Sequence, residues 1–173
     1  MLYNKYVHFK CLTSGLTYAD THYTFRVGVT TASMIVKQID IATGFFTNRY
    51  FPNCLGAIDG KQARIMNPLH SGSMFYNYKN SFSIILMAVA DSKFLFVYVD
   101  VGEYGRESYP SVFRHTSFGK KFKEGSLNLP PPERISVNTI PLPHVFIADE
   151  DFGLTTHLMR LYHMYSLLTK PSG

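Results

Sequence analysis

Two acidic residues stand out because each follows a run of apolar residues. Asp59 follows the apolar stretch in FPNCLGAIDGK, and Asp149 follows the apolar stretch in HVFIAD. Such runs predict buried strands. An unpaired buried charge costs several kcal/mol, so each Asp should be exposed at its strand's end, hydrogen-bonded, or bound to a cation. For Asp59 a simple Asp-Gly turn is an open alternative, because Asp-Gly is among the commonest turn pairs.

The two carboxylates together suggest metal chemistry. If the two strands are neighbours, both side chains emerge at the same edge of a sheet. Mg²⁺ and similar hard cations prefer oxygen ligands, and paired ions bridged by carboxylates activate a water and stabilise a leaving oxygen in phosphodiester chemistry. Asp59 and Asp149 are therefore the candidate catalytic residues and the candidate ligands of a divalent cation, Mg²⁺ or Mn²⁺.

Four other acids have competing explanations. Asp91 lies in a predicted hairpin turn, where Asp is favoured by its own backbone hydrogen bonding. Asp100 ends a predicted strand and points either to the metal site or away from it. Glu150 and Asp151 either cap a following helix or act as substitute ligands.

Other chemistries find less support in the sequence. The seven His have no zinc-ligand spacing, and there is no Gly-rich phosphate loop and no sign of a Ser or Cys nucleophile. Three basic residues near the first acid, Lys61, Arg64 and Lys79, either contact a phosphate backbone or are solvated surface charges.

The elements that position these residues follow from periodicity and turn signals. Residues 1–46 are predicted to form a small helix-turn-helix-like segment, with a helix over 18–25, a turn at Gly28 and a second helix capped by Thr30 or Thr31. Two packed helices without a DNA role are the plainer alternative. The apolar face of the second helix would carry Met34, Ile35, Ile39 and Ala42.

Residues 47–173 are predicted to form a mixed α/β segment. Residues 82–90 and 94–101 form a hairpin whose second strand is apolar on both sides, which predicts a central position in a covered sheet. A helix over 109–125, ended by Gly125, comes next. A proline-rich, exposed connection spans 128–143, and a helix over 154–168 closes the chain.

The composition is that of a globular protein with an anionic partner. Hydrophobic residues make up 46% and charged residues 17% of the 173 positions, and the formal net charge is +5. The positive balance favours nucleic acid as a partner. Two cysteines are too few for a disulfide framework, and the longest apolar run is too short to cross a bilayer, so we expect a soluble, intracellular protein.

Several blocks, in order, carry a family resemblance. They include FRVGVTTASMIV, FPNCLGAIDGK, VFRHTSFGK, GSLNLPPP and VFIADEDFGL. They resemble the DDE-superfamily endonucleases derived from PIF/Harbinger-type DNA transposases, over about residues 12–161. The resemblance implies a ribonuclease-H-like mixed sheet flanked by helices, a DNA substrate, a divalent cation, a nuclear location and a separate DNA-binding partner protein.

The family's two catalytic Asp residues match Asp59 and Asp149. Its third carboxylate, a Glu on a later helix, has no match, since no acidic residue follows Asp151. Gln62 stands at a position where the family has His, and Leu161 where it has Pro. These departures predict that the nuclease domain over 47–173 is incomplete at its C-terminus and cleaves DNA slowly or not at all. The alternative is a non-catalytic DNA-binding or partner-binding remnant.

Overall fold

The computed structural model describes residues 17, 19–20, 26 and 28–160 of the 173-residue chain. The chain divides into two compact units. The helical unit comprises Met1–Leu55, Asp91–Lys93 and Leu129–Val145, and the sheet unit comprises Gly56–Ala90, Phe94–Asn128 and Phe146–Gly173. The boundary predicted at residue 46 stays a prediction.

The helical unit is built on one long helix, α3, which spans Val29–Arg49. The predicted threonine cap is wrong, because the N-cap is Gly28 and no side chain caps the helix. The predicted apolar face is found in part: Ile35, Ile39 and Ala42 are half-buried, whereas Met34 is 42% exposed. The buried residues of α3 are Ala32, Val36 and Phe45. The predicted helix over 18–25 falls largely outside the described residues, so the helix-turn-helix stays a prediction.

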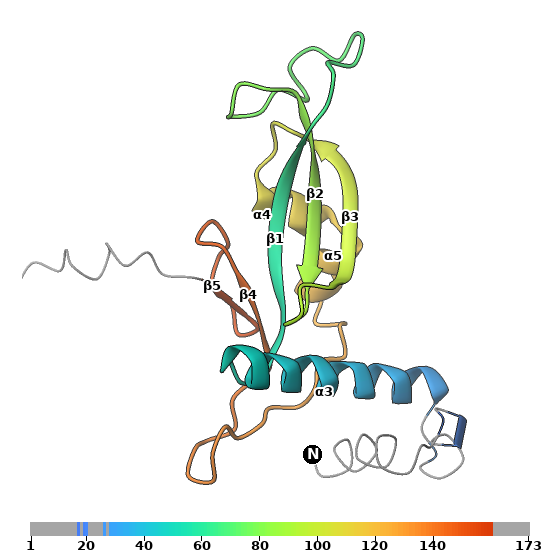
Figure 1. Ribbon diagram of the computed structural model, residues 1–173, viewed down its shortest axis with the longest axis vertical. Coiled ribbons are helices and arrows are strands. Elements are labelled where there is room, and N and C mark those ends of the chain that lie inside the picture. Colours follow the sequence, from blue (N-terminus) through green and yellow to red (C-terminus); the bar gives the residue numbers. More distant parts are fainter. Residues whose placement is uncertain (1–16, 18, 21–25, 27, 161–173) are drawn as a thin grey trace, which may run out of the picture. The chain divides into compact units, whose positions relative to one another are not determined.

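The sheet has five strands in the order β3-β2-β1-β4-β5 (Figure 1). The strands span Cys54–Arg64 (β1), Ser83–Ala90 (β2), Phe96–Tyr104 (β3), Val145–Ala148 (β4) and Leu158–Arg160 (β5). β1, β2 and β3 are joined by antiparallel pairing, and β4 and β5 are parallel to each other. The predicted hairpin of β2 and β3 is confirmed. The condition on which the metal-site hypothesis depends, that the strands before Asp59 and Asp149 are neighbours, is met, because β1 and β4 are adjacent in the sheet.

The prediction of a central, covered position for β3 is wrong. β3 lies at the edge of the sheet, and several of its apolar side chains are exposed, including Phe96 at 66% and Val101 at 54%. Apolar residues on both sides of a strand indicate that both faces could be covered. They do not indicate whether another part of the protein covers them.

Two short helices cover one face of β1 to β3, behind the strands in Figure 1. They are α4 (Tyr109–His115) and α5 (Ser117–Lys123). The sequence predicted one helix here, but Thr116 is extended and its side chain accepts from the backbone of Gly119, 2.9 Å away, which caps α5 and separates it from α4. Gly125 follows the C-cap of α5 with a positive φ of 68°, a conformation that glycine adopts readily after the end of a helix.

A cluster of phenylalanines forms the core between the helices and the sheet. The ring of Phe113 lies 5.7 to 5.9 Å from the rings of Phe118, Phe122 and Phe152. The ring of Phe146 on β4 packs edge to face against Phe118 and Phe122. This cluster joins α4, α5, β4 and the turn after β4 into one packed layer.

The last described residues of the chain differ in structure from the sequence prediction. Residues 158–160 form strand β5, not a helix, because Leu158 and Met159 pair with Phe146 and Ile147 of β4. The rest of the predicted helix lies outside the described residues. The proline-rich connection over 128–143 is largely exposed, as predicted, and it folds back on itself through a bridge between Glu133 and Leu142.

Candidate active site

Asp59 lies in the middle of β1 and not at a strand end. β1 continues to Arg64, and Asp59 is paired with Ala88 of β2. Both sequence expectations, a strand-ending carboxylate and an Asp-Gly turn, are therefore wrong. Asp59 is exposed, so no burial penalty has to be offset by a cation. Its Oδ1 accepts from the backbone N–H of Gly60, 2.7 Å away.

Asp149 directly follows the last residue of β4, Ala148, as predicted. It is exposed, and its Oδ1 accepts from the backbone N–H of Glu150 at 2.7 Å. The turn that carries it is closed by a bond from the N–H of Phe152 to the carbonyl of Asp149, 3.1 Å long. Phe152 is 2% exposed and packs on Phe113, which anchors the acidic turn to the core.

Asp59 lies on the face of the sheet that α4 does not cover. Asp59 pairs with Ala88, and Ala88 pairs with Val99, so all three side chains point to one face. Gly60 points to the other face, where Tyr109 of α4 covers it. Asp149 lies one residue beyond the end of β4, in the turn, so the alternation of that strand does not assign it to either face.

The remaining acidic candidates now have assigned positions. Asp91 accepts from the backbone N–H of Lys93 at 2.8 Å, which confirms its turn role. Asp100 pairs with Met87 and so lies on the helix-covered face, where Tyr98 donates to its Oδ2 at 3.0 Å. It therefore does not share a face with Asp59. Glu150 and Asp151 lie in the turn after β4, and Asp151 lines a hollow beside α4.

The three basic candidates are exposed but do not form one group. Lys61 lies two residues beyond Asp59 on the same strand face, since it pairs with Leu86 of β2. Arg64 ends β1 on the opposite face. Lys79 lies in the β1–β2 loop with its Nζ 5.3 Å from the centre of the Tyr78 ring.

Tyr109 is the residue beside the site that the sequence analysis missed. Its ring lies over the backbone of Gly60, so closely that a Cβ there would fall 2.4 Å from its Cδ1 atom. Burial raises the pKa of its phenol above the ordinary value of 10.0, and the neighbouring Tyr78 and the negative charge of Asp59 raise it further. A tyrosine between the capping Ser108 and Pro110, at the first position of a helix, carries no distinctive sequence signal, so only the fold reveals it.

Gln62 supports the same region. Its Nε2 donates to the carbonyl of Gly105 at 3.0 Å, and its Oε1 accepts from the hydroxyl of Ser83. The amide of Asn77 donates to that hydroxyl at 2.7 Å, and its own oxygen accepts from the backbone of Lys79 at 2.9 Å. This chain of hydrogen bonds holds the loop of Tyr78 and the segment leading to Tyr109 against β1.

The comparisons with known proteins give one match. The family model described as DDE superfamily endonuclease matches residues 58–171. This chain belongs to the DDE superfamily of endonucleases. Neither the curated proteins nor the solved structures give a match.

The matched segment of this DDE superfamily endonuclease contains both Asp59 and Asp149. A nuclease family implies a DNA substrate, and such endonucleases generally use divalent metals. Among the described residues, no group of three or more His, Cys, Asp or Glu side chains is arranged to hold a metal ion. Two carboxylates fit an oxygen-preferring cation in kind, while a group with a third such ligand is not found in that part of the chain.

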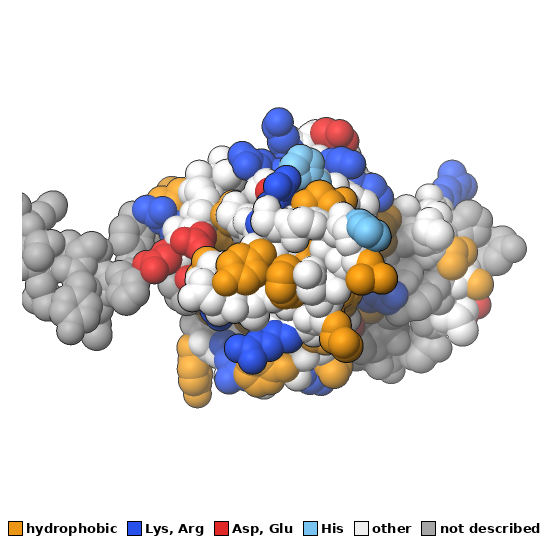
Figure 2. All heavy atoms as spheres, turned by 90° about the horizontal axis from the view of Figure 1, so that it is seen from above, with side chains coloured by type: hydrophobic (Ala, Val, Ile, Leu, Met, Phe, Trp, Pro, Cys, Tyr) orange, Lys and Arg blue, Asp and Glu red, His pale blue; other side chains and the backbone are white. Residues whose placement is uncertain are grey.

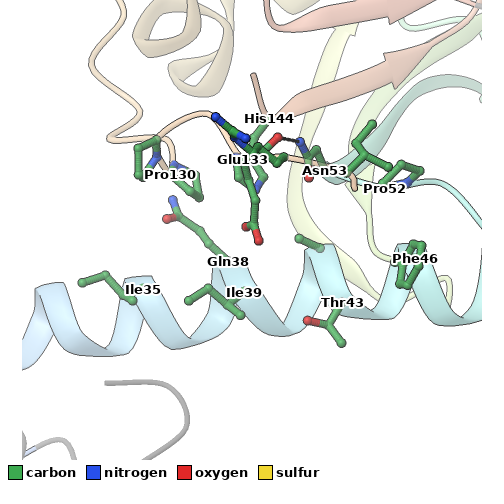
Figure 3. A pocket seen from close by; sticks show the side chains of 14 residues that line it. Ile35, Gln38, Ile39, Thr43, Phe46, Pro52, Asn53, Pro130, Glu133 and His144 are labelled. Carbon is green, nitrogen blue, oxygen red and sulfur yellow. Dashed lines mark hydrogen bonds between the residues drawn. The ribbon is translucent and has the colours of Figure 1, made fainter. Parts of the chain in front are cut away.

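The endonuclease has a second hollow, of about 320 Å³, within its helical unit (Figure 3). Ile35, Ile39 and Phe46 of α3 form one wall, and Pro130 lies across from them. Asn53 closes one end by donating to the carbonyls of Glu133 and Leu142 at 3.0 and 3.1 Å. Glu133 is the one carboxylate in its lining, so this hollow offers no carboxylate pair for a metal. No helix in the described part of the chain is long and apolar enough to span a membrane.

Proposed function

We propose that this chain is a transposase-derived, divalent-metal-binding endonuclease domain of the PIF/Harbinger type that acts on DNA phosphodiesters. The observation that carries the proposal is that β1, which contains Asp59, and β4, which Asp149 directly follows, are neighbours in the sheet and lie largely inside the segment that matches the family. Strand order β3-β2-β1-β4-β5, with an antiparallel β1–β2–β3 sheet followed by helices, supports a ribonuclease-H-like fold.

The residues divide the work as follows. Asp59 and Asp149 would hold the cation, which supplies an activated water and stabilises the leaving oxygen. Lys61, exposed on the face of Asp59, would contact the phosphate backbone of the bound DNA. Tyr109 and the Gln62 hydrogen bonds keep β1 and the adjoining loops in place while DNA binds.

We further propose that catalysis is weak. Two-metal phosphoryl chemistry requires both ions to be fixed about 3.5–4 Å apart, and displacing a reacting group by about 1 Å costs on the order of a hundredfold. The described residues provide two candidate carboxylates and no metal-binding group of three. Metal should therefore bind weakly, and DNA should be cleaved slowly.

Metal binding is tested by calorimetry with Mn²⁺. The wild type should bind weakly, and its fold should gain about 2.7 kcal/mol at a hundredfold excess of Mn²⁺ over Kd. Asp59→Asn and Asp149→Asn should each remove most of this gain. Asp100→Asn is the matched control, because it makes the same change on the opposite face of the sheet. Equal responses in all four proteins would remove Asp59 and Asp149 from the site.

Cleavage is tested on supercoiled plasmid with Mg²⁺ and then Mn²⁺. We expect slow nicking that disappears in Asp59→Asn and Asp149→Asn but survives in Asp100→Asn. Fast nicking with the same dependence would show that the catalytic site is complete. A protein that binds DNA, does not nick it and shows no metal binding that depends on Asp59 and Asp149 would favour the alternative, a non-catalytic DNA-binding or partner-binding protein.

A further inference from the structure

A hollow of about 300 Å³ lies beside α4 in the sheet unit. Its lining includes two tyrosines, Tyr78 and Tyr109, together with Gln62, Arg106, Glu107 and Asp151. This volume is at the lower end of the range of small-ligand sites. The lining combines aromatic surfaces with hydrogen-bonding groups, which is the composition of a site for a flat, polar ring.

The two tyrosines differ in how firmly they are held. Tyr109 is half-buried and packed on the backbone of Gly60. Tyr78 is 72% exposed, although its loop is fixed by the hydrogen bonds that Asn77 makes to Ser83, Lys79 and Ser81. The protein thus holds an accessible aromatic ring in a defined place, at a low further entropic cost to a ligand that stacks on it.

The charges of the hollow select against a phosphate inside it. Arg106 is its one cation, and the Nε atom of Arg106 lies 3.4 Å from the carboxylate of Glu107. Asp151 adds a second negative charge. A phosphate there would meet two carboxylates and one guanidinium already engaged by an acid. A neutral ring with donor and acceptor groups on its edge suits these side chains better.

The surroundings supply the positive charge that the hollow lacks. Lys79 lies over the Tyr78 ring and is exposed. Figure 2 looks onto the β1–β2 loop and shows exposed hydrophobic side chains beside Lys and Arg side chains. Aromatic surfaces flanked by cations are typical of proteins that bind single-stranded nucleic acid, where bases stack and the backbone runs along the cations.

The hollow lies on the helix-covered side of β1. Its Tyr109 ring packs on Gly60, whereas the side chain of Asp59 points to the opposite face of the sheet. A strand bound with a base at Tyr78 therefore does not depend on the metal site. We propose that this hollow binds one unpaired nucleobase of the DNA substrate, stacked on Tyr78. This inference rests on the proposed function and specifies its substrate as DNA with an unpaired nucleotide.

The experiment measures binding in EDTA by fluorescence anisotropy, so that neither metal nor cleavage enters. Three labelled probes of equal length are compared: an oligo-dC strand, a base-free deoxyribose-phosphate strand, and a duplex. The wild type should bind oligo-dC at least tenfold more tightly than the base-free strand, because stacking contributes about 1–3 kcal/mol per base, or roughly five- to 150-fold. Its affinity for oligo-dC should also exceed that for the duplex.

Three variants identify the residue responsible. Tyr78→Ala should bind oligo-dC and the base-free strand equally, whereas Tyr78→Phe should retain the preference. Tyr50→Asn removes a tyrosine that is 88% exposed in the helical unit, at a left-handed position that Asn tolerates, and should behave as the wild type. Near-ultraviolet and far-ultraviolet circular dichroism confirm that each variant is folded.

The outcomes separate this inference from the proposed function. Equal binding of all three probes by the wild type, or an unchanged preference in Tyr78→Ala, would overturn the nucleobase site and leave the Asp59-dependent metal binding untouched. If Mn²⁺ does not stabilise the wild type, but the wild type still prefers oligo-dC and Tyr78→Ala does not, the endonuclease proposal would be overturned and a single-strand binding site would remain. A preference that Tyr78→Ala abolishes and Tyr78→Phe restores would support the inference.

Discussion

The contact between Gly60 and Tyr109 permits a sharp test of the region around the proposed site. A Cβ added at Gly60 would lie 2.4, 2.5 and 2.7 Å from three atoms of the Tyr109 ring. Favourable carbon contacts lie at about 3.5–4.0 Å, so the ring would have to move by about 1 Å. Overpacking of this kind costs about 1–3 kcal/mol. We expect Gly60→Ala to lower the free energy of unfolding by that amount.

A double-mutant cycle shows whether Tyr109 is the cause. In a Tyr109→Ala background the clash is absent, and Gly60→Ala should be neutral or stabilising by up to about 1 kcal/mol, because alanine loses less conformational entropy than glycine in a strand. The coupling between the two sites should therefore be about 1–4 kcal/mol in size. Urea unfolding of the four proteins, followed by circular dichroism, measures each free energy.

A matched control separates the clash from a general effect of the added methyl group. Gly153→Ala adds the same methyl where no heavy atom lies within 4 Å and φ is not positive, so it should change stability by less than about 0.5 kcal/mol. If Gly60→Ala costs the same with and without the Tyr109 ring, Tyr109 does not pack on β1 in the way described. The positioning role given to Tyr109 would then have to be withdrawn.

Two further predictions concern the anchor of the acidic turn and the Tyr109 phenol. Phe152→Ala should lower the free energy of unfolding, measured in urea, by about 3–5 kcal/mol. It should also weaken Mn²⁺ binding in calorimetry, because Asp149 loses its packed support. Unchanged metal affinity in the folded variant would show that other contacts hold the turn. Because the pKa of Tyr109 is raised in the folded state, its contribution to stability is complete below pH 10.0 and is lost as the pH rises through the folded-state pKa. With rising alkaline pH, the free energy of unfolding should fall less steeply for Tyr109→Phe than for the wild type. Parallel pH profiles of the two proteins would contradict the raised pKa.

Local sequence patterns predicted the elements whose partners are close in the chain. The β2–β3 hairpin follows from two apolar runs around Asp91, and the structure shows the side-chain bond from Asp91 that closes the turn. The same pattern could not place β3 at the edge, because edge and centre differ only in what lies beyond the strand. The single helix predicted over 109–125 is divided at Thr116 for a related reason: a threonine inside a helical pattern and a threonine that caps the next helix look alike in sequence.

The candidate site comes from the sequence, and its role stays a prediction. The acid after each apolar run made Asp59 and Asp149 the candidates, and the strand order makes β1 and β4 neighbours. The apolar run before Asp59 suggested a strand end, yet the strand continues because Lys61, Gln62 and Ala63 pair with β2 as well. Tyr109 and Gln62 are brought to the site by contacts far apart in the chain, and no local pattern encodes such contacts.

The exposed position of Asp59 has an evolutionary consequence. Its side chain points away from the packed layer, and the core beneath it is made by other residues. Replacing it would therefore cost the fold little, since exposed positions away from special features change stability by about 0.5 kcal/mol or less. Selection for a folded protein does not protect this carboxylate, so under the proposed function only selection for metal binding and cleavage would retain it. In this architecture a nuclease can lose its chemistry by single substitutions and persist as a stable domain available for other roles.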